Sequence, residues 1–128
     1  MILWREGRVV SLDAEWPGAL ECTVDVLDDA TRTWTPARAL AYPELVGRPR
    51  VGDLVLLNTT ALDAGLGTGG YAFVVAVPLH VPAPAPLGPG HIVKARYTPL
   101  QTMVLAVDEP DSPHRELLRE ADDLFGTP

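Results

Sequence analysis

Two segments of the sequence carry residues that could bind an anion. The first is the run from Gly65 to Gly70, in which four of six residues are glycine. Successive backbone N–H groups in turns of such a run can form a concave site for phosphate or carboxylate. The second is the pair Lys94 and Arg96, two cations on one face of an expected strand in an acidic chain. If the segments converge, they predict an anion site formed by Gly67, Thr68, Gly69, Gly70, Lys94 and Arg96.

Both segments also have a structural interpretation, which we favour. The glycine run is not followed by the Lys-Ser or Lys-Thr pair of a phosphate-binding loop. An expected strand follows it, whereas a dinucleotide site needs a helix whose N-terminus faces the phosphate. The run then joins two strands of a long hairpin, where glycine permits positive φ. Lys94 and Arg96 form a solvated face that pairs with acidic residues nearer the C-terminus.

The remaining reactive residue types form no recognisable constellation. Cys22, the only cysteine, alternates with Val24 and Val26 on an apolar face, which indicates a core position. The three histidines, His80, His91 and His114, lack the spacing of a metal site. We therefore predict no catalytic residue and no metal site, and the sequence identifies no cofactor.

Composition restricts the possible partners. The chain has 128 residues, enough for one hydrophobic core, and its net charge is −7. Nucleic acids and anionic membranes bind through dense positive charge, so we expect neither as a partner. Single-stranded nucleic-acid binding on a barrel face ranks last, because only Tyr97 lies beside two cations. No segment has the apolar length of a signal peptide or a membrane span, which predicts a cytoplasmic protein.

The elements that would position these residues are mainly β-strands. Apolar and polar residues alternate along 20–27, the pattern of a half-buried strand. Similar evidence predicts a small β-barrel or sandwich of about six to seven strands. The expected strands are 2–12, 20–27, 33–42, 54–57, 71–77, 91–97 and 102–107. Pro36 within one of them indicates an edge position or a bulge.

Two helices complete the expected fold. Thr60, with Asp63 three residues later and Gly65 as a stop, predicts a short capped helix near 60–64. Pro113 in the first turn predicts a C-terminal helix from 111 or 112 to 125. We expect residues 1–128 to form a single β-rich domain. It comprises core strands in 1–79, a Pro-rich linker or strap in 80–90, and a strand pair plus helix in 91–125.

Three phrases of the sequence resemble a known family. They are the segments 52–61, 65–71 and 90–101, the last reading Gly90-His91-Ile92-Val93-Lys94-Ala95-Arg96-Tyr97-Thr98-Pro99-Leu100-Gln101. The chain from about Leu3 to Arg119 resembles the N-terminal region of an uncharacterised bacterial family, domain of unknown function 3866. The resemblance implies no activity and supplies no catalytic residue. Longer members continue into what looks like an α/β region.

The sequence is compatible with two functions. The first is a non-catalytic accessory or interaction domain of a larger protein, whose partner is the remainder of a longer polypeptide or a separate protein. The second is an enzyme or a binding domain for a phosphorylated or carboxylated small molecule, using the loop from Gly65 to Gly70 with Lys94 and Arg96. The second requires that the loop and the two cations converge.

Overall fold

The computed structural model describes residues 1–65, 69–92, 100 and 103–117. The chain divides into two compact units, Met1–Ala83 and Pro84–Pro128. The boundary falls inside the Pro-rich segment 80–90, where prolines remove backbone donors and oppose both helix and sheet. That the whole chain forms a single domain stays a prediction.

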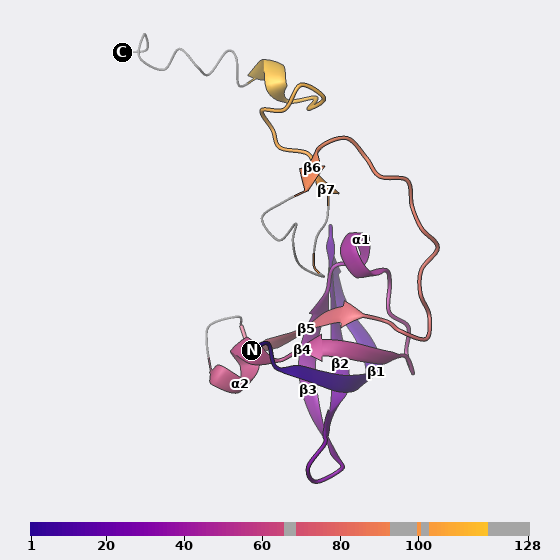
Figure 1. Ribbon diagram of the computed structural model, residues 1–128. Helices are drawn as coiled ribbons and strands as arrows, with labels where there is room; N and C mark the ends of the chain where they lie inside the picture. Colours follow the sequence, from indigo (N-terminus) through magenta and orange to yellow (C-terminus); the bar gives the residue numbers. More distant parts are fainter. Residues whose placement is uncertain (66–68, 93–99, 101–102, 118–128) are drawn as a thin grey trace. The chain divides into compact units, whose positions relative to one another are not determined.

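The first unit is a closed five-stranded barrel (Figure 1). The strands are β1 (Trp4–Trp16), β2 (Ala19–Asp28), β3 (Thr33–Ala41), β4 (Leu54–Asn58) and β5 (Tyr71–Ala76). Their order around the barrel is β1-β2-β3-β5-β4, with β1 also paired to β4. The pairing of β3 with β5 is parallel, and the other four pairings are antiparallel. The predicted mainly β fold is therefore confirmed, as a barrel.

Alternating side chains build the core of this barrel. Along β2, Leu20, Cys22 and Val24 point inward and are buried, while the residues between them are half-buried. Cys22 and Val24 belong to one buried cluster, to which the other strands contribute Val9, Ala39, Ala41, Val55, Leu57, Ala72 and Val74. A period of two puts alternate residues on one face, which is why the sequence pattern identified these strands.

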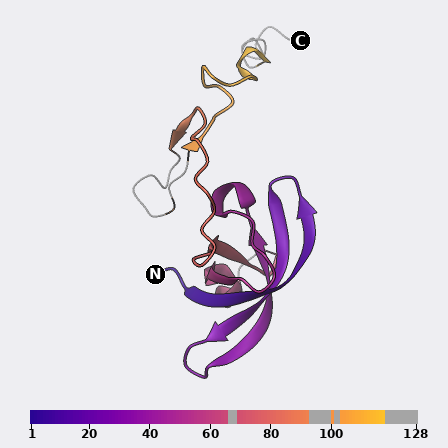
Figure 2. The same ribbon diagram turned by 90° about the vertical axis from the view of Figure 1, so that its right-hand side faces the viewer.

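Two hairpins extend from the barrel. The β1–β2 and β2–β3 hairpins project in different directions (Figures 1 and 2). Pro36 lies opposite Asp25 of β2, whereas β5 pairs with β3 only from Arg38 to Leu40. Pro36 therefore occupies a stretch of β3 with one neighbouring strand, where its missing N–H removes no ladder bond on the open side.

Two short helices connect the strands. The predicted helix is present as α2 (Thr60–Ala64) and ends at Gly65 in a left-handed conformation. The expected capping by Thr60 is wrong by one position, because Thr59 occupies the N-cap and the Thr60 hydroxyl instead accepts a hydrogen bond from Leu3 N. The helix α1 (Pro43–Val46) was not predicted, although proline in its first turn is a recognised signal.

The second unit contains a two-stranded sheet. Its strands, β6 (His91–Ile92) and β7 (Met103–Val104), are antiparallel neighbours, as predicted for the start of the strand 91–97 and for part of 102–107. The His91 imidazole contacts the Glu109 carboxylate within this unit. Residues 115–117 are helical, whereas 111–114 are not, so the predicted start of the C-terminal helix at 111 or 112 is wrong. The rest of the predicted strand 91–97 and of the C-terminal helix, at 93–97 and 118–125, lies outside the described residues.

Within the part of the chain that the structure describes, no helix combines the length and apolarity needed to cross a membrane.

Gly7 provides a test of barrel closure. It is buried in β1, opposite Val26 of β2 and Val55 of β4. A Cβ at this position would lie 2.6 Å from Leu57 Cδ1. We expect Gly7→Val to lower the free energy of unfolding by about 1–3 kcal/mol, measured by urea denaturation, because overpacking strains a close-packed core.

A double-mutant cycle identifies the cause. Leu57→Ala alone is destabilising, but combined with Gly7→Val it removes the atom in the way, so the pair should cost less than the sum of the single changes. Strictly additive effects would contradict a clash between these two side chains.

Candidate functional site

One end of the barrel opens into a cavity of about 550 Å³, which we call the mouth cavity. Residues 26–28 of β2 and 35–38 of β3 form one wall. Thr59, Leu62 and Asp63 form the opposite wall at α2, and Arg5 and Gly70 complete the lining. The volume is in the range of small-molecule sites.

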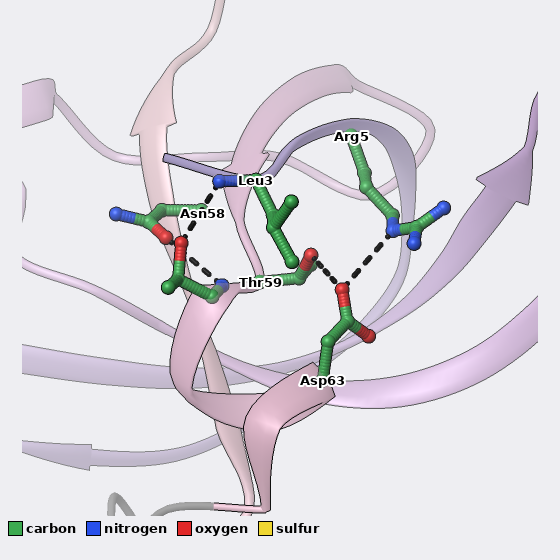
Figure 3. A network of polar contacts seen from close by, with 6 residues as sticks. Leu3, Arg5, Asn58, Thr59 and Asp63 are labelled. Carbon is green, nitrogen blue, oxygen red and sulfur yellow. Dashed lines mark hydrogen bonds and ion pairs between the residues drawn. The ribbon is translucent and has the colours of Figure 1, made fainter. Parts of the chain in front are cut away.

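A side-chain network holds α2 at this mouth (Figure 3). The buried Thr59 hydroxyl donates to Asp63 Oδ2 at 2.7 Å, and Arg5 Nε donates to the same oxygen at 3.3 Å. Leu3 N donates to the Thr60 hydroxyl at 2.9 Å. A helix of five residues has little stability by itself, so these contacts with the start of β1 fix its position.

Arg38 fixes the end of the glycine run. Its Nη2 donates to the carbonyl of Gly69 at 2.7 Å, and its guanidinium lies over the Tyr71 ring, 4.7 Å from the centroid. A Cβ on Gly70 would lie 3.2 Å from Arg38 Nη2. The sequence analysis missed Arg38, because only the parallel pairing of β3 with β5 places it opposite Tyr71.

The mouth cavity combines opposite charges with apolar surface. Arg5 and Arg38 are balanced by Asp63 and Asp28. Backbone N–H groups of Thr31 and Ala30 bind the Asp28 carboxylate and lower its pKa, so it is ionised at neutral pH. The apolar part of the lining comprises Val26, Leu27, Pro36, Ala37 and Leu62. Such a cavity suits a polar ligand without a large net charge.

Only part of the predicted anion site lies within the described residues. Gly70 lines the mouth cavity, and Gly69 and Gly70 have φ values of 68° and 80°. These values agree with the hairpin interpretation, in which glycine is needed for its backbone conformation. The other predicted residues, Gly67, Thr68, Lys94 and Arg96, lie outside the described residues. The anion site at these residues stays a prediction.

A second polar cluster, which the sequence analysis did not identify, centres on Asp53. The turn from Arg50 to Asp53 has Gly52 at φ 90° in its third position, as a type II turn requires. Asp53 Oδ2 accepts a hydrogen bond from Arg50 N at 2.7 Å, and its Oδ1 contacts Nδ1 of His80. Val9 N and Gly52 N bond across to Asp53 O and Val9 O, which anchors the turn to β1.

Burial and hydrogen bonding act in opposite directions on the pKa of Asp53. Its side chain is 3% exposed, and burial by itself raises the pKa. The hydrogen bonds from Arg50 N and His80, together with the positive charges of both residues, outweigh burial and leave the pKa lowered. Asp53 is therefore a buried carboxylate that orients the His80 ring.

Cys22 occupies the core position predicted for it. It is fully buried among β-strand side chains, and burial, followed by the nearby carboxylates of Asp13 and Glu21, raises the pKa of its thiol to about 11. The reactive thiolate is thus scarce at neutral pH. Among the described residues, no group of three or more His, Cys, Asp and Glu side chains could hold a metal ion.

Together these features define a small closed β-barrel with a cavity at one mouth. The model of the family described as Protein of unknown function (DUF3866) matches residues 38–128, and the chain belongs to this family. No curated protein and no solved structure matches the chain.

Replacing Asp63 tests the network that holds α2. Asp63→Ala removes the acceptor of the buried Thr59 hydroxyl and the partner of Arg5. We expect the free energy of unfolding to fall by about 1–2 kcal/mol in urea denaturation, mainly through the buried hydroxyl. The control is Asp29→Ala, which breaks an ion pair with Arg32 whose side chains are 78% and 73% exposed. This control should cost less than about 0.5 kcal/mol, and equal losses would argue against the network.

Asp53 predicts a pH dependence of stability. Because its pKa is lower in the folded protein than in the unfolded chain, its contribution is present above the unfolded value of about 3.9 and disappears as pH falls through the lower folded value. Urea denaturation from about pH 6 to about pH 2.5 should show wild type losing more stability than Asp53→Asn, which cannot titrate there. Parallel curves for the two proteins would contradict this assignment.

Proposed function

We propose that the chain is a non-catalytic binding domain, acting as an accessory or interaction module, and that its ligand occupies the mouth cavity. The proposal rests on one observation, namely which elements line the cavity. Its wall is formed by residues of β2, of β3 and of the segment that joins β4 to β5.

These are the elements through which one class of barrel binds its ligands. The barrel here has five strands, a β1 shared between β2 and β4, and a β5 inserted between β3 and β4. This arrangement resembles the oligonucleotide- and oligosaccharide-binding (OB) barrels, which bind on strands 2 and 3 and on the loops joining strands 1–2 and 4–5. The resemblance is one of fold, so the ligand must be argued from the cavity itself.

The charge of the cavity lining and of the whole chain restricts which ligands such a barrel could bind. The two arginines of the mouth cavity are matched by two aspartates, and the whole chain carries −7. A polyanionic strand would be repelled, because its binding depends on an excess of positive charge. The balanced lining and the apolar wall favour a small polar ligand without a large net charge. Paired charges and hydrogen-bonding groups orient it, and apolar contact supplies affinity.

The competing proposal retains the residues of the sequence analysis. In it, Gly67, Thr68, Gly69 and Gly70 bind a phosphate or carboxylate together with Lys94 and Arg96, in a binding or enzymatic domain. Gly70 in the cavity lining supports the involvement of this loop, but it equally serves the first proposal.

A blocking substitution tests the mouth cavity. Thr35 is exposed on β3 and lines the cavity, whereas Thr33 is exposed on the same strand and does not line it. In an NMR screen of neutral, zwitterionic and charged fragments, neutral or zwitterionic hits should shift the amides of the cavity walls. Thr35→Trp should weaken these hits about tenfold or more, and Thr33→Trp should change them less than about twofold.

Two outcomes would overturn the proposal. One is a set of hits whose shifts map away from the mouth cavity. The other is equal weakening by the two tryptophan variants, which would indicate a general effect of the larger side chain. Far-ultraviolet circular dichroism of each variant checks that the barrel has formed.

A further inference from the structure

A second cavity lies in the same unit, away from the residues that line the mouth. It has a volume of about 440 Å³ and is formed by Val46 at the end of α1, by residues 47, 48 and 50, which follow α1, and by residues 77 and 79–82, which follow β5. We call it the α1–β5 pocket. Its polar lining is basic, with Arg48, Arg50 and His80.

The backbone around this pocket is constrained. Gly47 ends α1 with φ 83°, and a Cβ on it would lie 2.9 Å from Pro82 Cγ. The two sides of the pocket therefore pack closely at Gly47 and Pro82. The Arg50–Asp53 turn is anchored to β1 by the bonds described above. A preformed pocket does not have to be ordered when a ligand binds, which favours affinity.

The orientation of His80 leaves its second ring nitrogen, Nε2, to contact a ligand. Its Nδ1 contacts the buried Asp53 carboxylate, while the His80 side chain is 51% exposed. A protonated imidazole donates from both nitrogens, so the Asp53 carboxylate accepts the hydrogen bond from Nδ1 and the Nε2 N–H is left for an anion. Asp53 is a positioning residue here, because its contact with Nδ1 holds the ring in this orientation.

The two arginines of the pocket differ in whether a carboxylate pairs with them. Arg48 makes two hydrogen bonds to the Glu15 carboxylate, one of 2.9 Å from Nη2, and this contact lowers the pKa of Glu15. Arg48 is therefore largely neutralised by its partner. Among the described residues, no carboxylate lies within ion-pair distance of the Arg50 guanidinium. Arg50 is therefore left to bind a negative charge, and His80, which contacts Asp53 through Nδ1, can add only its Nε2.

The rest of the pocket is apolar. Val46, Val77, Leu79, Val81 and Pro82 line it, and Leu79 and Val81 are 71% and 78% exposed. Exposed aliphatic side chains beside a cationic site can cover the uncharged part of a ligand. The cavity also has more room than a bare inorganic anion would fill.

We propose that the α1–β5 pocket binds a small organic anion. Its phosphate or carboxylate head contacts the Arg50 guanidinium and His80 Nε2, and its apolar body lies against Leu79 and Val81. Both head groups match the donor geometry of arginine, and both accept from an imidazolium. This site is independent of the mouth cavity and of the function proposed for it.

Calorimetric titration with phenyl phosphate and with benzoate tests the proposal. Wild type should bind at least one of the two, and the tighter one identifies the head group. Arg50→Gln and His80→Gln should each weaken that ligand about tenfold or more, because each removes one charge-assisted contact. Arg32→Gln, at a remote and highly exposed arginine, removes the same charge and should change affinity less than about twofold.

Three results would overturn the proposal. They are the absence of binding of both probes by folded wild-type protein at millimolar concentration, equal weakening by Arg32→Gln, and inorganic phosphate and acetate binding as tightly as their aromatic counterparts. The last result would remove the role of the apolar wall. Urea denaturation of each variant shows whether a loss of binding comes from a loss of fold.

Discussion

The closure of the barrel depends on one strand that pairs on both sides. β1 runs antiparallel to β4 through its first residues and to β2 through the remainder, and Gly7 and Arg8 face partners on both strands. At Gly7 the backbone comes so close to Leu57 that a side chain would collide. Closure removes exposed sheet edges, which otherwise invite pairing with other chains. It also fixes where the two ends of the barrel lie, and both cavities of the first unit follow from that placement.

Short helices and turns take their positions from contacts with the barrel. α2 has five residues and is held by the contacts of Thr59, Thr60 and Asp63 with each other and with the start of β1. The Arg50–Asp53 turn is held by backbone bonds to Val9 and by the buried Asp53 carboxylate. In both places a polar side chain is buried only where its hydrogen bonds are satisfied, as the cost of burial requires. These contacts therefore fix the positions of the segments that line the cavities.

Much of the fold could be predicted because its signals are local. Alternation along 20–27 identified β2, the run from Tyr71 identified β5, and Gly65 identified the end of α2. Two of the errors had separate causes, a long-range contact and an element too short to show a period. Thr59 and Thr60 are adjacent and chemically alike, so the sequence could not show that the Thr60 hydroxyl is engaged by Leu3. The four-residue α1 has too few residues to display a helical period.

The sequence by itself determined where apolar and polar residues alternate along strands and where glycine and proline end these strands. It also determined that Cys22 belongs to the core. Only the tertiary structure decided which polar groups meet. Arg5 and Asp63 are 58 residues apart, Arg38 and Gly69 are 31 apart, and Asp53 and His80 are 27 apart. No periodicity reports such pairs, because they arise from strand order and register, and these depend on long-range pairing energies rather than on neighbouring residues. Sequence patterns do not predict the cavities either, because each cavity is lined by segments that only barrel closure brings together.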